Sequence, residues 1–566
     1  MNRADAHSFN HNRSRSQDWL PAVVVSLGVS LVIVAPFFWL GNASGHDIGF
    51  HASSWVDVAA QWKEGILFPR WTEWANYGYG EPRFIFYPPL SWLLGGALVS
   101  LLPIKAVAAV FIVLVQTVAG TSAYTLAREF ASRGGALAGA ACFAANPDAL
   151  LIIYVRSDYA ELLAMAFYPL LMLALLRLCG WLGEEHGQGR GEIVFFALSF
   201  AAIWLANAPA GVIASYTAAL LIAGAAITQK SWRPAGRGAA GIALGLGLAA
   251  FYLVPAAYEQ RWVNISQALS AGLTPRENFL FAGTGDPDHN HFNHVASAMA
   301  VLTMVLIAVF AWMAWRRINA NFAIGRDSMA RKAWTALILL AGASNLLMVK
   351  VTLPLWDMLP KLRFVQFPWR WISVLAVVLT IFLASGLTGQ KRLWAWAAVV
   401  FVVLGSSAVY LGKNTWWDAD DFPTIQYEVE LGHGFEGTDE YDPLGDDHLD
   451  LAQKQPQVRT VGDSKGAKAD VIAWTAEKRV LEVQALKPEK LALRLLDYPA
   501  WRITVDGKAI HAEHLRGVRA IVVAVPAGKS VVEAEFTRTR DRTIGGLLSA
   551  ASLLAACLLW IDSGKK

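Results

Sequence analysis

Long apolar runs separated by short polar segments dominate the chain. The first run, from Leu20 to Leu40, is too long for the core of a cleaved signal peptide and indicates a transmembrane helix. Further runs of spanning length follow at 105–127, 134–154, 161–181, 193–206, 210–229, 238–258, 295–315, 333–350, 370–389, 393–412 and 543–561. The pattern therefore predicts a polytopic all-α membrane protein with about twelve transmembrane helices.

The composition agrees with this class. Hydrophobic residues make up 55% of the chain and charged residues 16%, and the mean hydropathy is +0.39. The net charge is only +4, from 48 basic and 44 acidic residues, and does not imply nucleic acid as a partner. The lipid bilayer is the first partner to expect.

Basic residues predict the orientation, because Lys and Arg favour the cytoplasmic side of short loops. The apolar run 88–102 is about fifteen residues long, which is short for a crossing. If this run is a juxtamembrane helix that does not cross, the basic loops all fall inside. These loops are 128–133, 184–190, 230–237, 316–332, 391–392 and 565–566. The polar N-terminal segment 1–18 is then cytoplasmic.

The same orientation divides the chain into regions. We expect a transmembrane domain over 19–412, an extracytoplasmic region over 413–541, and a final helix with a cytoplasmic tail over 542–566. The segments predicted to lie outside are the first outer loop 43–87, the turn 156–161, the loops 259–294 and 351–369, and the region 413–541.

A small β-sandwich is predicted just before the last helix. From about Val471 the chain alternates apolar and polar residues in runs of strand length at 479–486, 490–497, 501–505, 518–524 and 530–536. Asp506–Gly507, between two of these runs, is typical of a hairpin turn.

The stretch 418–450 has a different character, with twelve acidic residues and no Lys or Arg. Such charge blocks usually form a solvated, partly flexible linker, which is the prediction here. A calcium site is the alternative.

The first outer loop combines ionisable and aromatic residues. His46, Asp47 and His51 follow the first helix directly, and ionisable groups at a membrane surface often indicate function. Asp47 could instead be a helix cap or a salt-bridge partner. The many Trp and Tyr residues of the loop suit a belt at headgroup depth or, alternatively, a surface for stacking on sugars.

Several short motifs follow one another in a particular order. They are Phe-Pro-Arg-Trp at 68–71, Tyr-Gly-Tyr-Gly-Glu-Pro at 77–82, Phe-Tyr-Pro-Pro-Leu at 86–90, Tyr-Val-Arg at 154–156 ahead of Glu161, Phe-Tyr-Leu-Val-Pro at 251–255, Gln-Phe-Pro-Trp-Arg at 366–370 and Trp-Arg-Ile-Thr-Val-Asp-Gly-Lys at 501–508. An acid soon after the first helix, a long outer loop and Tyr-Pro-Pro-Leu before an apolar run resemble membrane glycosyltransferases of the GT-C superfamily. More narrowly, the chain resembles bacterial membrane proteins of the YfhO type and relatives labelled "6-pyruvoyl-tetrahydropterin synthase related".

This resemblance implies a GT-C-like fold in the cytoplasmic (inner) membrane of a bacterium, with the active site on the extracytoplasmic side. The implied reaction transfers a sugar from a polyprenyl-phosphate donor to a surface glycan, a lipid or a protein. The acid of the first loop, Asp47, would be the general base that takes the proton of the acceptor hydroxyl.

The leaving lipid phosphate needs positive charge, which a guanidinium supplies through two hydrogen bonds. Arg156, Arg363 and Arg370 lie on predicted outer segments and are the candidates, with Lys361 and Arg83 behind them. We also expect His51, which follows Asp47 closely in the sequence, and Glu161, which follows Arg156 closely, to contact the donor.

No cofactor is predicted, and a divalent metal is not favoured. The imidazoles of 289–294 are close enough in sequence for zinc, but His289 and His291 would point to opposite sides of a strand. The first outer loop also lacks the Asp-x-Asp motif of metal-using GT-C enzymes.

Two other functions compete with sugar transfer. A transporter or flippase of lipid-linked glycan would place Asp47 and Arg156 in a translocation path, and charged residues in the middle of spans would favour it. A non-catalytic envelope assembly protein would use the outer region to bind glycan or protein, and would tolerate the loss of the Asp47 charge.

Overall fold

The computed structural model describes residues 19–182, 189–322, 328–389, 393–445, 451, 453–462, 466–515 and 517–563, with the side chains of 317–331 left out. Several positions used in the sequence analysis lie outside these ranges. They are the segment 1–18, the loop positions 184–188, 323–327, 391–392 and 565–566, and the acidic residues Asp446, Asp447 and Asp450.

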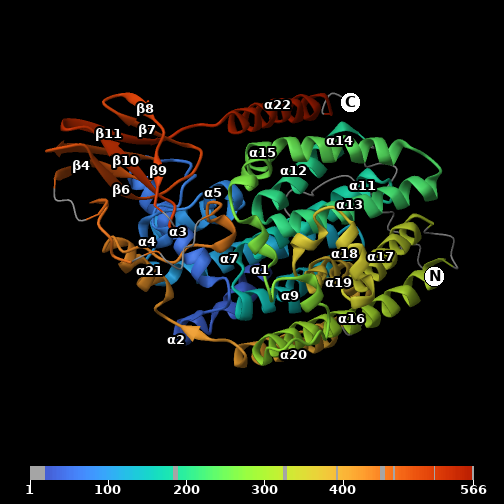
Figure 1. Ribbon diagram of the computed structural model, residues 1–566. Coiled ribbons are helices and arrows are strands. Elements are labelled where there is room, and N and C mark those ends of the chain that lie inside the picture. Colours follow the sequence, from blue (N-terminus) through green and yellow to red (C-terminus); the bar gives the residue numbers. More distant parts are fainter. Residues whose placement is uncertain are drawn as a thin grey trace, which may run out of the picture.

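A bundle of long helices forms the larger part of the molecule (Figure 1). Its helices are α1 (Leu20–Val34), α6 (Pro89–Leu101), α7 (Val107–Ala127), α8 (Arg133–Ala144), α9 (Pro147–Leu151), α10 (Tyr159–Met165), α11 (Tyr168–Leu178), α12 (Arg190–Ala206), α13 (Ala208–Gln229), α14 (Arg233–Leu248), α15 (Ala250–Glu259), α16 (Pro287–Phe322), α17 (Ser328–Leu347), α18 (Leu353–Met358), α19 (Ile372–Leu387), α20 (Leu393–Lys413) and α22 (Arg540–Ser563).

Nine helices of the described ranges are long and apolar enough to cross a membrane, and two bent pairs raise the number to eleven. The pairs lie in the predicted spans 238–258 and 333–350, and they bend by 76° and 86°. The one remaining predicted span, 193–206, is α12, and this helix has 17 residues. The predicted polytopic helical fold is therefore confirmed, with nine to eleven spans instead of about twelve, because hydropathy does not report where a helix bends.

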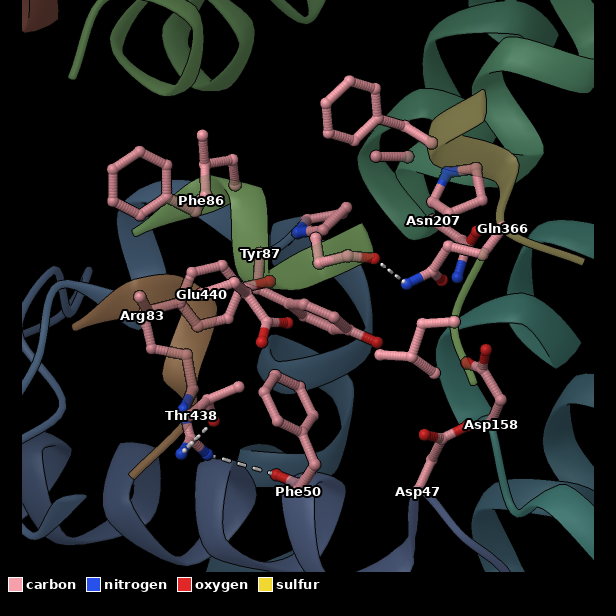
Figure 2. A pocket seen from close by; sticks show the side chains of 18 of the residues that line it. Asp47, Phe50, Arg83, Phe86, Tyr87, Asp158, Asn207, Gln366, Thr438 and Glu440 are labelled. Atoms are coloured by element: carbon pink, nitrogen blue, oxygen red, sulfur yellow. Dashed lines mark hydrogen bonds between the residues drawn. The ribbon is translucent and has the colours of Figure 1, made fainter. Parts of the chain in front are cut away.

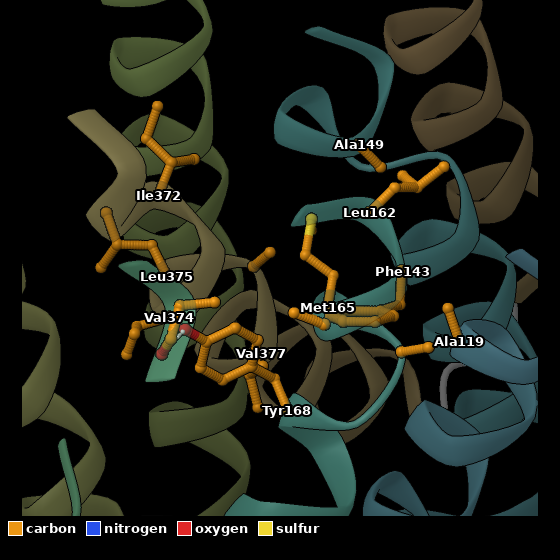
Figure 3. Close-up of a cluster of buried hydrophobic side chains, with 14 of the residues drawn as sticks. Ala119, Phe143, Ala149, Leu162, Met165, Tyr168, Ile372, Val374, Leu375 and Val377 are labelled. Carbon is orange, nitrogen blue, oxygen red and sulfur yellow. Dashed lines mark hydrogen bonds between the residues drawn. The ribbon is translucent and has the colours of Figure 1, made fainter. Parts of the chain in front are cut away.

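The bundle is organised around α19. All 16 of its residues are buried and none is charged, as expected for a helix that is apolar all round and surrounded by other helices. Figure 3 shows Val374, Leu375 and Val377 of α19 in one cluster with Leu162 and Met165 of α10.

Two antiparallel sheets form the predicted sandwich between α20 and α22. The strands are β3 (Val458–Thr460), β4 (Ala467–Thr475), β5 (Lys478–Ala485), β6 (Glu489–Leu496), β7 (Trp501–Val505), β8 (Lys508–Ile510), β9 (Glu513–His514), β10 (Ala520–Val525) and β11 (Gly528–Phe536). Their order is β3-β6-β10-β9 in one sheet and β4-β5-β11-β7-β8 in the other. Asp506 and Gly507 have φ values of 50° and 75° and join β7 to β8, which confirms the hairpin turn.

The sandwich shares its core with the first outer loop. Trp71 is fully buried, and its ring lies 5.5 Å from Trp501, 5.6 Å from Phe536 and 5.9 Å from Tyr498. Trp55 is also fully buried and stacks on Phe111 of α7 at 4.7 Å. The prediction of a headgroup belt is wrong for these two Trp residues, because their rings fill the spaces between the loop and its neighbours.

The acidic stretch is also part of the folded structure. Its strand β2 (Trp417–Asp418) pairs with β1 (Asn42–Ala43), and its helix α21 (Asp421–Glu430) packs on α3 (Ile48–Lys63) with Phe422 fully buried. The prediction of a solvated linker is therefore wrong for the described part of this stretch. Phe422 and Val429 are the buried residues of α21, and Asp421 at its start accepts a hydrogen bond from the Ser44 hydroxyl at 3.1 Å.

The segments that were predicted to lie outside meet at one end of the bundle. The sandwich covers this end (Figure 1). Helix α6 of the run 88–102 has 13 residues, or about 20 Å at the rise of an α-helix, which is less than the thickness of a bilayer core. Its juxtamembrane position stays a prediction.

Trp71→Ala should lower the free energy of unfolding by ~3–5 kcal/mol, because it leaves a cavity where the loop and the sandwich share their core. Denaturant titration of the purified protein measures this change. Trp232→Ala is the control, since that ring is 86% exposed, and it should change stability by no more than ~0.5 kcal/mol. Equal effects of the two changes would contradict the shared core.

Candidate active site

The backbone of the first outer loop lies directly against the turn after α9. Gly45 allows this approach, because a Cβ atom there would lie 2.4 Å from the carbonyl carbon of Arg156. The Asp47 N–H donates to the Arg156 carbonyl at 2.9 Å, and the Ser157 hydroxyl donates to the Ala43 carbonyl at 2.6 Å. Asp47 is therefore held beside Arg156 by main-chain contacts as well as by charge.

Arg156 is the centre of a buried charge cluster. Its Nη2 atom lies 3.1 Å from Asp47 Oδ2 and 3.0 Å from Asp158 Oδ2, and its Nη1 atom binds Glu161. Arg370 completes the cluster from the short helix η9 (Pro368–Trp371) just before α19, with Nε 2.9 Å from Glu161 Oε2 and Nη2 3.2 Å from Asp158 Oδ2. Three carboxylates thus surround two guanidinium groups, for a formal charge of −1.

Asp158 caps α10 through its side chain and lies between two candidate spans. Burial alone would raise the pKa of Asp158, but contacts with His51, Arg156 and Arg370 hold it well below its usual range. Asp158 is therefore an ionised, fully engaged group.

Asp47 differs from the other members of the cluster in exposure. Its side chain is 38% exposed, against 4–5% for Arg156 and Asp158. Arg156 holds one of its oxygens, Oδ2, while Oδ1 accepts no hydrogen bond from the described part of the chain. Asp47 is thus the most exposed carboxylate of this cluster.

A cavity of about 930 Å³ opens in front of Asp47. This volume is within the usual range for small-molecule sites. Its walls come from the first outer loop, the turn at 156–158, the loops 259–294 and 351–369, and the acidic stretch. Figure 2 shows Asp47 and Asp158 on one side of the cavity and Glu440 with Arg83 on the other, with Tyr87 between them.

The opposite wall carries a second carboxyl group. Glu440 belongs to the short helix η10 (Asp439–Tyr441), and burial raises its pKa to about 7. Arg83 beside it is 1% exposed and is engaged by Glu81 at 2.6 Å. Glu440 is therefore a group that changes its charge near neutral pH inside the cavity.

The structure separates the predicted site residues into three groups. Asp47, Arg156 and Arg370 line the cavity. His51 and Glu161 are 1% and 3% exposed and lie behind it, so neither reaches the cavity. Arg363 is exposed, with its guanidinium over Phe364 at 5.6 Å, and does not line it.

His51 has a positioning role. Its Nε2 atom accepts the Tyr159 N–H at 3.1 Å and lies 3.6 Å from Asp158 Oδ1. His51 and Glu161 do not line the cavity, because both side chains bind other members of the cluster, and their contact with a donor stays a prediction.

Asp158, Gln366 and Glu440 line the cavity but were not among the predicted site residues. Asp158 follows Arg156 by two positions in the sequence, and that spacing was the available signal. Gln366 has φ 64° and ψ −55°, a strained γ-turn that no motif indicates, and its Oε1 accepts from Arg370 at 3.2 Å. Glu440 was taken as one charge among many of the acidic stretch.

The histidines at 289–294 lie on α16 and not on a strand. His289 faces the Glu277 carbonyl at 3.3 Å, while His291 faces Asn414 at 2.8 Å. Within the described ranges, no group of three His, Cys, Asp or Glu residues could hold a metal ion, and this includes the acidic stretch.

Comparisons with known proteins were made by sequence and by structure. No family profile matches the sequence, and no curated protein matches it. Among solved structures, the arabinofuranosyltransferase AftD from Mycobacteria is similar over 74% of this chain and 30% of its own, at 16% identity and a TM-score of 0.43. The oligosaccharyltransferase AglB from Archaeoglobus fulgidus, in complex with an inhibitory peptide and a dolichol-phosphate, is similar over 70% of this chain and 55% of its own, at 13% identity and a TM-score of 0.33.

This chain thus spans less than two thirds of the length of either enzyme. No comparison confirms the YfhO type. At these identities and TM-scores, the function has to be inferred from the site of the chain itself.

Arg156→Ala should destabilise the protein by ~3–5 kcal/mol, because it leaves Asp158 and Glu161 as buried charges with one partner fewer. Denaturant titration measures the change. Arg363→Ala removes an exposed guanidinium from the same side of the molecule and should have an effect within ~0.5 kcal/mol. A stable Arg156→Ala protein would mean that the cluster is not the structural element described here.

Proposed function

We propose that the chain is an integral-membrane glycosyltransferase that moves a sugar from a polyprenyl-phosphate donor to an acceptor outside a bacterial cytoplasmic membrane. The acceptor class, a surface glycan, a lipid or a protein, stays open. One observation carries the proposal: Asp47 is a reachable carboxylate, fixed by Arg156 and by its own backbone, at the wall of a cavity of about 930 Å³.

Asp47 would act as the general base. Its Oδ1 atom takes the proton of the acceptor hydroxyl while Arg156 holds Oδ2. The acceptor oxygen forms a bond to the anomeric carbon, and the bond from that carbon to the phosphate oxygen breaks, with the electron pair leaving on the lipid phosphate.

The geometry favours a positioning role for Arg156 and Arg370 over phosphate binding. Both guanidinium groups are already paired with carboxylates, and the cluster has a formal charge of −1, which would repel a lipid phosphate. We therefore revise the role expected for these arginines: they hold Asp47 and Asp158 in place.

Lys361 is the better candidate for the donor phosphate. It lines the cavity, and its side chain has no carboxylate within salt-bridge distance in the described part of the chain. Its Nζ atom lies 3.5 Å from Gln260 Oε1 and 4.9 Å from the Phe364 ring centre. An ammonium group with free donors suits a phosphate that arrives from the membrane.

A translocation path fits the charge distribution less well. Arg156, Glu161 and Arg370 lie within three residues of the ends of their candidate spans, where these ends face the first outer loop. Asp148, on α9, is the buried carboxyl that lies deeper behind the cluster. Charges at the mouths of helices suit a site at the membrane surface more than a path through the bundle.

Asp47→Asn should reduce sugar transfer by ~10²–10⁴-fold, because an amide cannot accept the acceptor proton. Release of lipid phosphate from a panel of polyprenyl-phosphate sugars, followed by mass spectrometry, measures this loss. Asp288→Asn is the control, since Asp288 is exposed at the start of α16 and does not line the cavity, and it should keep full turnover. Unchanged turnover in Asp47→Asn would refute the base assignment, and binding without turnover in the wild type would favour a transporter or an assembly protein.

Donor affinity should fall as the pH rises through about 7, because Glu440 then becomes negatively charged in the cavity that receives a phosphate. Below that pH the carboxyl is protonated and neutral, so affinity is higher. Glu440→Gln should bind with the same affinity on both sides of pH 7, as measured from pH 6 to 8 by titration with a polyprenyl-phosphate sugar, a phosphodiester whose charge does not change in this range. A wild-type pH dependence that survives in Glu440→Gln would assign the titration to another group.

A further inference from the structure

A second cavity, of about 260 Å³, lies between the first outer loop, the start of α22 and the helices α6 and α15. Three arginines line it, Arg70, Arg538 and Arg542, and the rest of its wall is apolar or aromatic apart from a glycine. No carboxylate of the described ranges lines this cavity. The proposed mechanism uses none of the three arginines.

The three arginines differ in how far they are engaged. Arg542 is bound by Glu259, with Nε and Nη2 each 2.8 Å from a carboxylate oxygen. Arg70 is half-buried, with Nη1 3.5 Å from Glu477 Oε1. Arg538 is exposed, and its one hydrogen bond to the described part of the chain is long, 3.4 Å from Nη2 to the Arg542 carbonyl. The cavity therefore keeps unused guanidinium donors.

These arginines are close enough to affect one another. Burial lowers the pKa of Arg70, and the charges of Arg542 and Arg538 lower it further, while Glu477 opposes the change. An anion among the three groups would relieve this repulsion.

Gly546 brings Arg538 into the cavity. A Cβ atom at this position would lie 3.0 Å from Arg538 Nη2, so the guanidinium lies against α22 at the height of Gly546. The Arg538 side chain therefore runs along the beginning of α22, the helix that is apolar enough to cross a membrane.

The surroundings indicate a lipid and not a free ion. Helix α22 lies at the edge of the bundle, and only 11% of its hydrophobic stretch is buried against the rest of the protein. In a membrane, the cavity beside this helix would therefore be next to lipid. Leu547, next to Gly546, is 67% exposed, and Leu67, next to Phe68 of the cavity wall, is 80% exposed. Acyl or prenyl chains can run along this apolar surface while a phosphate meets the arginines.

We propose that this cavity binds the phosphate group of an anionic membrane lipid through Arg70 and Arg538, with Arg542 fixed behind them by Glu259. The site is distinct from the cavity in front of Asp47, although Tyr252 lines both. The Tyr252 hydroxyl donates to the Phe86 carbonyl at 2.8 Å, in the helix α5 (Arg83–Phe86) that contributes to both walls. The inference does not depend on sugar transfer, since lipid binding is its readout.

The test measures lipid binding to the purified full-length protein in detergent by native mass spectrometry. The probes are dioleoylphosphatidylglycerol, dioleoylphosphatidylcholine, undecaprenyl phosphate and inorganic phosphate. The double variant Arg70→Gln/Arg538→Gln should bind phosphatidylglycerol about tenfold more weakly than the wild type, because it loses two charge-assisted hydrogen-bond donors. Phosphatidylcholine should bind weakly and equally to both proteins.

Arg261→Gln is the matched control, because Arg261 is exposed, follows α15 and lines neither cavity. It should bind phosphatidylglycerol like the wild type, and a loss equal to that of the double variant would overturn the site in favour of general surface charge. Arg538→Lys should keep most of the binding that Arg538→Gln loses, because it keeps the positive charge. This result would tie the loss of binding to that charge and not to misfolding.

The binding that the double variant loses also identifies the source of the phosphate. Binding at the cavity in front of Asp47 is the same in the two proteins, so it does not contribute to this loss. A larger difference with undecaprenyl phosphate than with phosphatidylglycerol would assign a prenyl phosphate, and the reverse would assign a phospholipid. Equal binding of phosphatidylglycerol by the two proteins would overturn the proposal. Binding of inorganic phosphate without any lipid binding would overturn the lipid assignment.

Discussion

Two guanidinium groups buried against three carboxylates determine how the outer parts of this protein are arranged. Taking such charges out of water costs several kcal/mol for each ion, and only close pairing offsets that cost. Arg156 and Arg370 come from different helices, and Asp47 comes from a loop more than a hundred residues earlier in the chain. The pairing therefore fixes the loop against the helices, and the cavity exists because these elements are held at that distance from one another.

The sandwich and the acidic stretch stabilise the other wall. Trp71 joins the first outer loop to the sandwich, and the pairing of β1 with β2 joins it to the acidic stretch. Arg83 adds a polar link, since its Nη2 atom donates to Thr438 Oγ1 at 3.1 Å across the same contact. Glu440 is brought to face Asp47 across the cavity by these contacts, and its altered pKa is a consequence of the burial that they cause.

Much of the fold could be predicted because it depends on local patterns. Apolar runs of spanning length gave the bundle, and alternating runs after Val471 gave the strands with the hairpin at Asp506–Gly507. The errors have a common cause. Trp55, Trp71 and Phe422 of the acidic stretch are buried by partners distant in sequence, and neither residue type nor charge density reports a distant partner.

For the candidate site, the sequence by itself determined the class of the chain, the loop after the first helix that holds Asp47, and the short spacing between Arg156 and Glu161. The tertiary structure decided which of these groups a ligand can reach. Asp47 keeps a free oxygen at the cavity, while His51 and Glu161 face inward and Arg363 points away. The physical reason is that exposure and charge pairing depend on which segments pack together, and the packing at Gly45 and around the two buried arginines is a property of the whole chain.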